Sequence, residues 1–245
     1  MSASPDKQRL DQLLVERGLA GTREKAKRLI LAGLVLVNGQ RRDKPGESMA
    51  SSSRVELIEK LPYVGRGGLK LEAALRHFAI GVEGKTCLDV GASTGGFTDC
   101  LLQHGAARVH AIDVGSGQLD WRLRNDPRVA VREGLNARYL GYDDLGEPVD
   151  LAVCDVSFIS ATLIVPRIVP LLREGGEMVI LVKPQFEAGR GQIGKGGIVR
   201  DPEVRQAARV KVEETMKGLG FHSDTIDCPV PGAEGNREFL LHARK

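Results

Sequence analysis

The chain has 245 residues, of which 42% are hydrophobic and 27% are charged, a composition typical of a globular protein and not of a disordered one. Its longest apolar run falls well short of the roughly 18–20 residues that a membrane helix needs, and its first residues show no secretory signal. We therefore expect a cytoplasmic protein that does not bind membranes. The net charge is +3, but residues 1–60 hold 12 Lys and Arg against 8 Asp and Glu, whereas the rest hold 23 against 24. A basic segment joined to a near-neutral one indicates an anion-binding module attached to a second domain.

The cysteines do not indicate a metal site. Cys87, Cys100, Cys154 and Cys228 form no Cys-x-x-Cys pair, and the five histidines are scattered singly along the chain. Because structural zinc needs closely spaced soft ligands, we expect no bound metal. We expect the cysteines to be small buried hydrophobes in a reducing compartment.

The basic N-terminal segment has the pattern of a small helix–helix–hairpin unit. Three leucines within residues 10–14 fall on one helical face. Thr22 is placed to cap a second helix, which Gly33 ends. Val35 and Val37 have the two-residue spacing of one strand face, and Asn38-Gly39 follows them, which is a strong hairpin signal.

Basic residues gather on the second predicted helix and around the hairpin. They are Arg23, Lys25, Lys27, Arg28, Arg41 and Arg42. Such a cluster can hold a phosphate backbone, although a merely solvated basic helix has the same pattern. The polar residues 48–53 are either a loop of this unit or its edge, and one more strand is expected at residues 55–58. The predicted organisation is a first domain at residues 1–60, a linker at 61–64 and a second domain at 65–245.

Helices and strands alternate from residue 64 onward. Strands are predicted at residues 87–90, 109–112, 129–131, 151–154 and 178–182, followed by a long helix over 204–219 and late strands near 221–226 and 238–243. Alternation of this kind, with a glycine-rich turn after the first strand, predicts an α/β fold with a doubly wound, mostly parallel sheet.

The glycine-rich turn spans residues 89–98, at a strand-to-helix junction where glycines let the backbone approach a ligand closely. It is not the dinucleotide pattern Gly-x-Gly-x-x-Gly, because Ser93 stands two residues after Gly91. Asp113 ends the next predicted strand, 22 residues after Gly91, about where a ribose-binding acid belongs. The combination favours an adenosine-bearing cofactor, and the alternative is a tight structural turn with an unrelated aspartate.

A second glycine-rich segment, residues 189–196, nearly matches the phosphate loop of nucleotide triphosphatases. Gly196 stands where that loop needs a Ser or Thr to bind magnesium, and the segment does not open directly into a helix. We therefore reject a triphosphatase. We expect instead a flexible basic loop, with Arg190 and Lys195, near a polyanionic substrate.

Three charged residues from distant parts of the sequence are expected at one edge of the sheet. Asp155 and Lys183 each follow a predicted strand, and the carboxyl ends of parallel strands share the edge where ligands bind in open α/β sheets. Glu238 begins the last strand, whose start reaches the same edge if that strand runs antiparallel. Each residue alone is compatible with simple solvation, but the three together favour a catalytic site beside the glycine-rich turn.

Eight sequence blocks carry a family resemblance. Three lie in the basic segment: Arg9-Leu10-Asp11-x-Leu13-Leu14, Thr22-Arg23-x-x-Ala26 and Gly33-x-Val35-x-Val37-Asn38-Gly39. Five follow it: Gly65-Arg66-Gly67-Gly68-Leu69-Lys70-Leu71, Leu88 through Phe97, Asp155-Val156-Ser157-Phe158-Ile159-Ser160, Val182-Lys183-Pro184-Gln185-Phe186-Glu187 and Gly235-Asn236-Arg237-Glu238. With these blocks the whole chain resembles the TlyA family, also called hemolysin A, in which an S4-type RNA-binding domain is fused to an FtsJ-like methyltransferase.

The resemblance implies a Rossmann-like class I methyltransferase with a seven-stranded sheet and a small N-terminal α+β S4 domain. It implies S-adenosyl-L-methionine-dependent 2′-O-methylation of cytidine in 16S rRNA, 23S rRNA or both, with ribosomal RNA or ribosomal subunits as partners. The implied catalytic residues are Lys70, Asp155, Lys183 and Glu238, of which Lys70 comes from the resemblance alone. The expected cofactor-binding residues are Asp89, Gly91, Ser93, Gly95, Gly96, Phe97, Thr98, Asp113, Asn136 and Asp155. The expected RNA-binding residues are the basic cluster described above together with Arg9, Arg66, Arg190 and Lys195.

A ribose 2′-hydroxyl is a poor nucleophile until its proton is removed or its lone pair is aimed. We expect Lys183 to accept that proton or to position the hydroxyl, with Asp155 and Glu238 orienting the lysine and the ribose. The S4 domain is expected to supply phosphate contacts, which position an RNA without reading its bases. Two alternatives remain: a hemolysin or other membrane-acting protein, as the older family name suggests, and a non-catalytic rRNA-binding pseudoenzyme. The sequence leaves the oligomeric state open, and a monomer is compatible with it.

Overall fold

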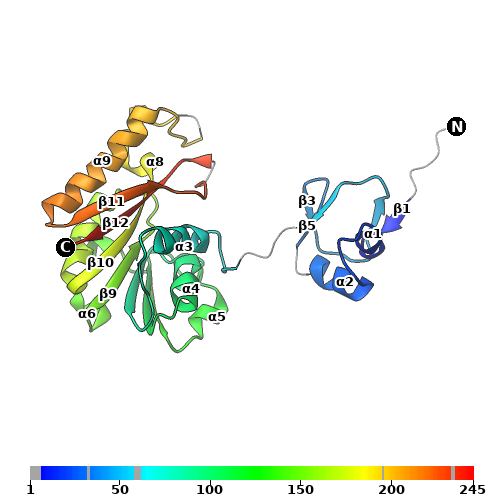
Figure 1. The fold of residues 1–245 in the computed structure, drawn as a ribbon, viewed down its shortest axis with the longest axis horizontal. Helices are drawn as coiled ribbons and strands as arrows, with labels where there is room; N and C mark the ends of the chain where they lie inside the picture. Colours follow the sequence, from blue (N-terminus) through cyan, green and yellow to red (C-terminus); the bar gives the residue numbers. More distant parts are fainter. Residues whose placement is uncertain (1–6, 32–33, 58–61, 195, 233–234) are drawn as a thin grey trace. The chain divides into compact units, whose positions relative to one another are not determined.

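The computed structural model describes residues 7–31, 34–57, 62–194, 196–232 and 235–245. The chain divides into two compact units, Met1–Leu61 and Pro62–Lys245 (Figure 1). Within the described ranges, every helix is too short or too polar to cross a membrane.

Residues 62–64 belong to the second unit and not to the expected linker. Tyr63 is buried in the core of that unit. The Val64 backbone N–H donates a 2.8 Å hydrogen bond to Asp99 Oδ2. The remaining position of the expected linker, residue 61, lies outside the described residues.

The described residues of the first unit form two helices and two small antiparallel sheets. Its elements are β1 (Lys7–Arg9), α1 (Leu10–Glu16), α2 (Arg23–Leu31), β2 (Val35–Val37), β3 (Gln40–Arg42), β4 (Ser48–Ala50) and β5 (Val55–Leu57). β1 pairs with β4, and β2 lies between β3 and β5. The polar stretch at 48–53 therefore contains a strand, which is too short for its alternation to be visible in the sequence. Gly33 and residue 58, the expected ends of a helix and a strand, lie outside the described residues.

The expected helices and hairpin of this unit are confirmed. Thr22 Oγ1 accepts a 3.1 Å hydrogen bond from the Lys25 N–H, as an N-cap residue does. Asn38 and Gly39 have φ angles of 52° and 78°, the left-handed values that a two-residue hairpin turn requires. The apolar faces of α1 and α2 pack together in a core that also includes both valines of β2.

The second unit is a seven-stranded α/β domain, which confirms the expected fold. Its strands are β6 (Thr86–Val90), β7 (Arg108–Asp113), β8 (Val129–Glu133), β9 (Val149–Cys154), β10 (Leu172–Val182), β11 (His222–Asp227) and β12 (Phe239–Arg244). Its α-helices include α3 (Gly67–His77), α4 (Gly96–Gln103), α5 (Trp121–Arg124), α6 (Tyr142–Leu145), α7 (Val165–Ile168), α8 (Pro184–Glu187) and α9 (Pro202–Gly218), and its short 3-10 turns include η1 (Ala137–Tyr139), η2 (Ala161–Leu163), η3 (Val169–Leu171) and η4 (Arg190–Gln192). The strand order is β11-β12-β10-β9-β6-β7-β8, in which β12 runs antiparallel to both its neighbours and the pairs from β10 to β8 are parallel.

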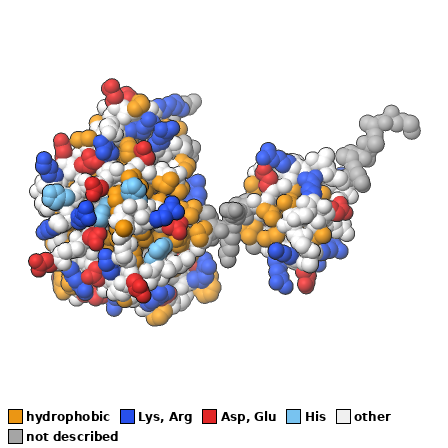
Figure 2. All heavy atoms as spheres, viewed as in Figure 1, with side chains coloured by type: hydrophobic (Ala, Val, Ile, Leu, Met, Phe, Trp, Pro, Cys, Tyr) orange, Lys and Arg blue, Asp and Glu red, His pale blue; other side chains and the backbone are white. Residues whose placement is uncertain are grey.

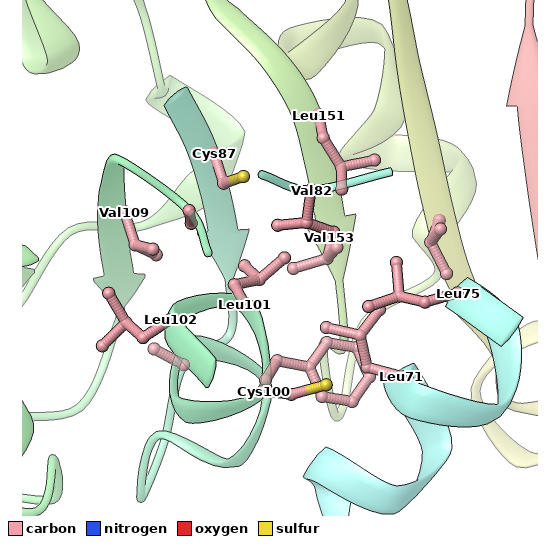
Figure 3. Packing of buried hydrophobic residues seen from close by; sticks show 14 of the residues in the cluster. Leu71, Leu75, Val82, Cys87, Cys100, Leu101, Leu102, Val109, Leu151 and Val153 are labelled. Atoms are coloured by element: carbon pink, nitrogen blue, oxygen red, sulfur yellow. The ribbon is translucent and has the colours of Figure 1, made fainter. Parts of the chain in front are cut away.

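Helices cover both faces of this sheet (Figure 1). Because successive strand residues point to opposite faces, Cys87 of β6 packs in the core beneath α3 and α4, and Leu88 packs in the core beneath α9. Figure 3 shows the first of these cores, where Leu71 of α3 and Leu101 of α4 lie against the sheet. Burial on both faces explains the short continuous apolar runs from which the central strands were predicted.

The cysteines are free thiols, and Cys87, Cys100 and Cys154 are buried. Burial raises the pKa of each of these three thiols to about 12, so they stay protonated at neutral pH. In the part of the chain that the structure describes, no three His, Cys, Asp or Glu side chains gather as a metal site.

Candidate active site

The glycine-rich turn connects the end of β6 to the start of α4. Gly91 has a φ of 89°, and a Cβ at this position would clash with the carbonyl oxygen of Asp155. Gly95 has a φ of 98°, and a Cβ there would clash with the Leu123 side chain. Gly91 therefore lets the turn pass directly against the loop that follows β9, where Asp155 lies, and Gly95 lets it pass against α5.

Asp113, the last residue of β7, forms hydrogen bonds both to this turn and to the loop that follows β7. Its Oδ2 accepts a 2.8 Å hydrogen bond from the Ser93 N–H, and its Oδ1 accepts a 2.7 Å hydrogen bond from the Gly115 N–H. Each carboxylate oxygen has two lone pairs, so Asp113 can hold the turn in place and still accept hydrogen bonds from a ligand.

A pocket of about 550 Å³ lies at this edge of the sheet, within the roughly 300–1,000 Å³ typical of small-molecule sites. Its lining includes five of the expected cofactor-binding residues: Gly91, Ser93, Asp113, Asn136 and Asp155. Apolar parts of the wall come from Val90, Ile112, Val114, Leu135, Ile159 and Ile164. The pocket thus combines two carboxylates and an amide with apolar surface.

A smaller pocket of about 200 Å³ adjoins the large one, since the two share Gly91, Ser93 and Asp155. Two further expected cofactor-binding residues, Gly96 and Phe97, line this small pocket. Lys70 of α3 lines it as well. Of the expected catalytic residues, Lys70 and Asp155 therefore face the same space.

Three expected cofactor-binding residues, Asp89, Gly95 and Thr98, line neither of these two pockets. Thr98 Oγ1 donates a 2.7 Å hydrogen bond to Asp89 Oδ2 inside the protein. Burial raises the pKa of Asp89 to about 7, and its Oδ1 has no hydrogen-bond partner among the described residues. In this structure Asp89 and Thr98 join β6 to α4 through their hydrogen bond, and Gly95 is part of the turn between them.

Lys183 and Asp155 form an ion pair where the neighbouring strands β10 and β9 end. Lys183 Nζ lies 2.5 Å from Asp155 Oδ1 without hydrogen-bond geometry, and it donates a 2.9 Å hydrogen bond to Ser157 Oγ. Nζ also lies 5.9 Å from the centre of the Phe186 ring, within the range of a cation–π contact. Lys183 lines neither pocket itself, but its partner Asp155 lines both pockets and its partner Ser157 lines the large one.

Lys70 and Glu238 form a second ion pair, with 2.5 Å between Nζ and Oε2. The Lys70 side chain is 11% exposed and the Glu238 side chain 2%. Glu238 directly precedes β12, which is antiparallel to β10 with Phe239 opposite Val182. The three strand-end charges therefore reach the same edge of the sheet, as the sequence predicts. The two ion pairs carry two positive and two negative charges, so the site offers donors and acceptors to a neutral hydroxyl group.

Two expected RNA-binding residues of the first unit are held by a buried carboxylate. Asp11 is fully buried, and its Oδ2 lies 3.0 Å from both Arg9 Nη2 and Arg23 Nε. The hydrogen bond from Arg9, followed by that from Arg23, lowers the pKa of Asp11 against the opposing effect of burial.

The other expected RNA-binding residues differ in their surroundings. Arg42 lies 3.5 Å from Glu47. Four more are exposed and, within the described ranges, form no ion pair: Lys25, Lys27, Arg28 and Arg41. Figure 2 shows Lys and Arg side chains on the surface of the smaller unit. In the second unit, Arg66 is exposed at the small pocket, whereas the Arg190 side chain and Lys195 lie outside what the structure describes.

Three residues near the site were not singled out from the sequence: Ser157, Phe158 and Glu187. Phe158 is 92% exposed with a φ of 65°, and its ring centre lies 5.3 Å from that of Phe186. Glu187 is buried. For Ser157 and Phe158 the available signal was their position close after the strand-end residue Asp155, whereas nothing in the sequence marked Glu187, whose contacts only the packing shows.

Residues 63–245 match the family model of FtsJ-like methyltransferases, and residues 8–48 match that of the S4 domain. The chain belongs to the FtsJ-like methyltransferase family. The second unit is thus a methyltransferase and the first contains an S4 domain, which confirms the resemblance found in the sequence.

Relatives of this FtsJ-like methyltransferase carry two kinds of name. The chain is 46% identical over 239 residues to the 16S/23S rRNA (cytidine-2'-O)-methyltransferase TlyA of Mycobacterium tuberculosis, covering 96% of this chain and 89% of the relative. It is 44% identical over 236 residues to Hemolysin A of Brachyspira hyodysenteriae, covering 96% of this chain and 98% of the relative. A solved structure from Streptococcus thermophilus, also named as a hemolysin, superposes with a TM-score of 0.76 at 47% identity, covering 99% of this chain and 90% of that one.

Proposed function

We propose that this methyltransferase transfers the methyl group of S-adenosyl-L-methionine to the ribose 2′-hydroxyl of a cytidine in 16S rRNA, 23S rRNA or both. The observation that carries the proposal is the presence of two ion pairs, Lys183–Asp155 and Lys70–Glu238, beside a pocket that opens into a cofactor-sized cavity. The substrate is inferred from the name of the Mycobacterium relative, which is similar to this chain over both units. A ribosomal substrate places the reaction in the cytoplasm.

The residues of the large pocket fit S-adenosyl-L-methionine. Asp113 offers carboxylate oxygens to ribose hydroxyls, and Asn136 offers an amide at the same pocket. Val114 and Ile164 supply apolar wall for a flat base. When bound, this cofactor supplies a methyl group on a positively charged sulfur.

Lys183 is the residue that we place at the 2′-hydroxyl. Its Nζ is fixed by Asp155 and Ser157, so a hydroxyl that enters beside Asp155 meets the amine in one orientation. A neutral Nζ accepts the hydroxyl proton, and a charged Nζ holds the oxygen by donating to it. In either form the orientation contributes to the rate, because well-oriented reactants gain roughly 7–11 kcal/mol over free ones.

Phe158 is placed to hold the target base. Its ring is 92% exposed, lines the large pocket, and lies 5.3 Å from the Phe186 ring, so one aromatic surface is accessible beside the expected position of the reacting groups. Stacking of a base on such a ring contributes about 1–3 kcal/mol, and enzymes that modify a nucleotide take its base out of the stack. We infer that the cytosine turns out of the RNA onto Phe158, while the exposed cations of the S4 domain hold phosphates.

The test is methyl transfer from labelled S-adenosyl-L-methionine to ribosomal subunits, with mass spectrometry to locate the methyl group. Lys183→Ala should lower the single-turnover rate by about 10²–10⁴-fold, the usual contribution of a positioned acid–base group, while calorimetry shows unchanged cofactor affinity. Lys85→Ala is the matched control, since Lys85 is half-buried and pairs with Glu177 instead of a site residue. A rate retained in Lys183→Ala, or a loss explained wholly by weaker cofactor binding, contradicts the assignment.

A further inference from the structure

Glu187, the last residue of α8, is a buried carboxylate that the proposed mechanism does not use. Its Oε1 accepts a 2.6 Å hydrogen bond from the Ala161 N–H, and its Oε2 accepts one from Ser160 Oγ. Lys211 Nζ of α9 lies 3.2 Å from the same Oε2 and donates a 3.1 Å hydrogen bond to the Glu187 carbonyl oxygen. The side chain is 2% exposed, so these contacts replace water around the carboxylate.

These contacts join the two loops that carry the reacting groups. The loop after β9 begins with Asp155, continues through Ser157 and Phe158, and ends at Ser160, which caps η2. The segment after β10 begins with Lys183, which precedes α8. Glu187 ends α8, so its carboxylate bridges from the segment of Lys183 to the far end of the Asp155 loop.

Joining two loops through a buried charge has a high cost in free energy. Removing a carboxylate from water costs several kcal/mol, and an apolar contact of similar volume often serves stability equally well. A carboxylate, however, fixes distance and direction, because its two oxygens accept two hydrogen bonds in one plane. The backbone N–H of Ala161 and the hydroxyl of Ser160 are held in that way.

We propose that Glu187 is a positioning residue for methyl transfer, which sets the Asp155 loop at the correct distance from Lys183. The proposal rests on the proposed function of the site. Two of the three contacts that hold the Lys183 Nζ come from residues of this loop, Asp155 and Ser157. Release of the loop at Ser160 therefore loosens the amine as well as Phe158.

The variants separate positioning from folding. Glu187→Ala should lower kcat by about 10- to 100-fold, since a displacement of about 1 Å at a reacting group can cost 10²-fold. Glu187→Gln should retain more of kcat than Glu187→Ala, because its amide oxygen still accepts from the Ala161 N–H and its NH2 group can donate to Ser160 Oγ, although that NH2 group replaces an acceptor of Lys211 Nζ. Glu187→Asp should lose activity, because the shorter side chain cannot reach both partners. Ser160→Ala removes one of the two hydrogen bonds that the loop donates to Glu187, and its effect should not add to that of Glu187→Ala.

The matched control is Glu177→Ala. Glu177 also joins separate elements, through Lys85 and His242, but it lies opposite Leu151, toward the amino end of the parallel strands. Its loss should lower the melting temperature and leave kcat unchanged below that temperature. If Glu187→Ala behaves as Glu177→Ala does, the role of Glu187 is structural and the proposal is overturned.

Hydrogen–deuterium exchange of the full-length protein supplies a readout that does not depend on activity. Glu187→Ala should speed exchange at Ala161 and across the loop of residues 155–160, and Glu187→Gln should do so much less. Faster exchange with an unchanged kcat overturns the positioning role while the proposed function stands. Wild-type protein that methylates no ribose overturns the proposed function, whatever the exchange shows. If Glu187→Ala does not fold, Ser160→Ala decides the question, and a wild-type kcat in that variant counts against the proposal.

Discussion

The ion pair between Lys70 and Glu238 predicts a large loss of stability when only its cationic member is removed. Lys70→Met keeps most of the side-chain length but leaves a Glu238 carboxylate that is 2% exposed without its 2.5 Å partner. Breaking a buried pair in this way costs about 3–5 kcal/mol. For a domain of 150–250 residues each kcal/mol lowers the melting temperature by roughly 2–4 °C, so the expected decrease is roughly 6–20 °C.

The assay is calorimetry of the full-length protein, in which the unfolding of the methyltransferase domain is followed. The double variant Lys70→Met/Glu238→Gln removes both charges and should recover at least half of the loss, because a neutral amide costs less to bury than an unpaired carboxylate. Arg173→Met is the control, since Arg173 pairs with Asp150 at a half-exposed position and should shift the melting temperature by only a degree or two. A Lys70→Met protein that melts like the wild type would refute the reasoning, because Glu238 would then be stabilised by water and not by Lys70.

Two further predictions concern the target base and the glycine-rich turn. Phe158→Ala should lower the rate of methyl transfer by roughly 5- to 150-fold, the equivalent of the 1–3 kcal/mol of one stacked base. Phe158→Trp should retain the wild-type rate. Equal rates for the two variants in single-turnover assays would exclude stacking. Because burial raises the pKa of Asp89 to about 7 from an unfolded value near 4, the folded protein binds the proton more tightly. Stability should therefore fall by up to roughly 4 kcal/mol as pH rises from about 4 to 7 and change little above that pH. In Asp89→Asn that slope should be absent from denaturation curves measured across the same range, and an unchanged slope would assign it to other groups.

The fold could be predicted from the sequence because its central strands are buried on both faces and read as short apolar runs. The convergence of Asp155, Lys183 and Glu238 followed from strand direction alone, since the order of a doubly wound sheet fixes which strand ends share an edge. Lys70 had no such signal, because it lies within a helix that precedes the first strand of the domain. Glu187 had none either, because its importance depends on a contact with Ser160, 27 residues away, that only the packing of α8 against the loop creates.

The charge of the S4 domain shows what residue counts miss. The count of Lys and Arg treats Arg9 and Arg23 as equivalent to Lys25, but the structure places both guanidinium groups against the buried carboxylate of Asp11. The carboxylate reduces the net charge of this group of three side chains and fixes the orientation of both guanidinium groups. A guanidinium also has more N–H groups than one carboxylate can use. Fixed cations lose less side-chain entropy when they meet a phosphate than the free lysines of α2 do. The positive charge of this surface therefore comes from two kinds of side chain: two arginines whose orientation Asp11 fixes, and exposed lysines of α2 that form no ion pair within the described ranges.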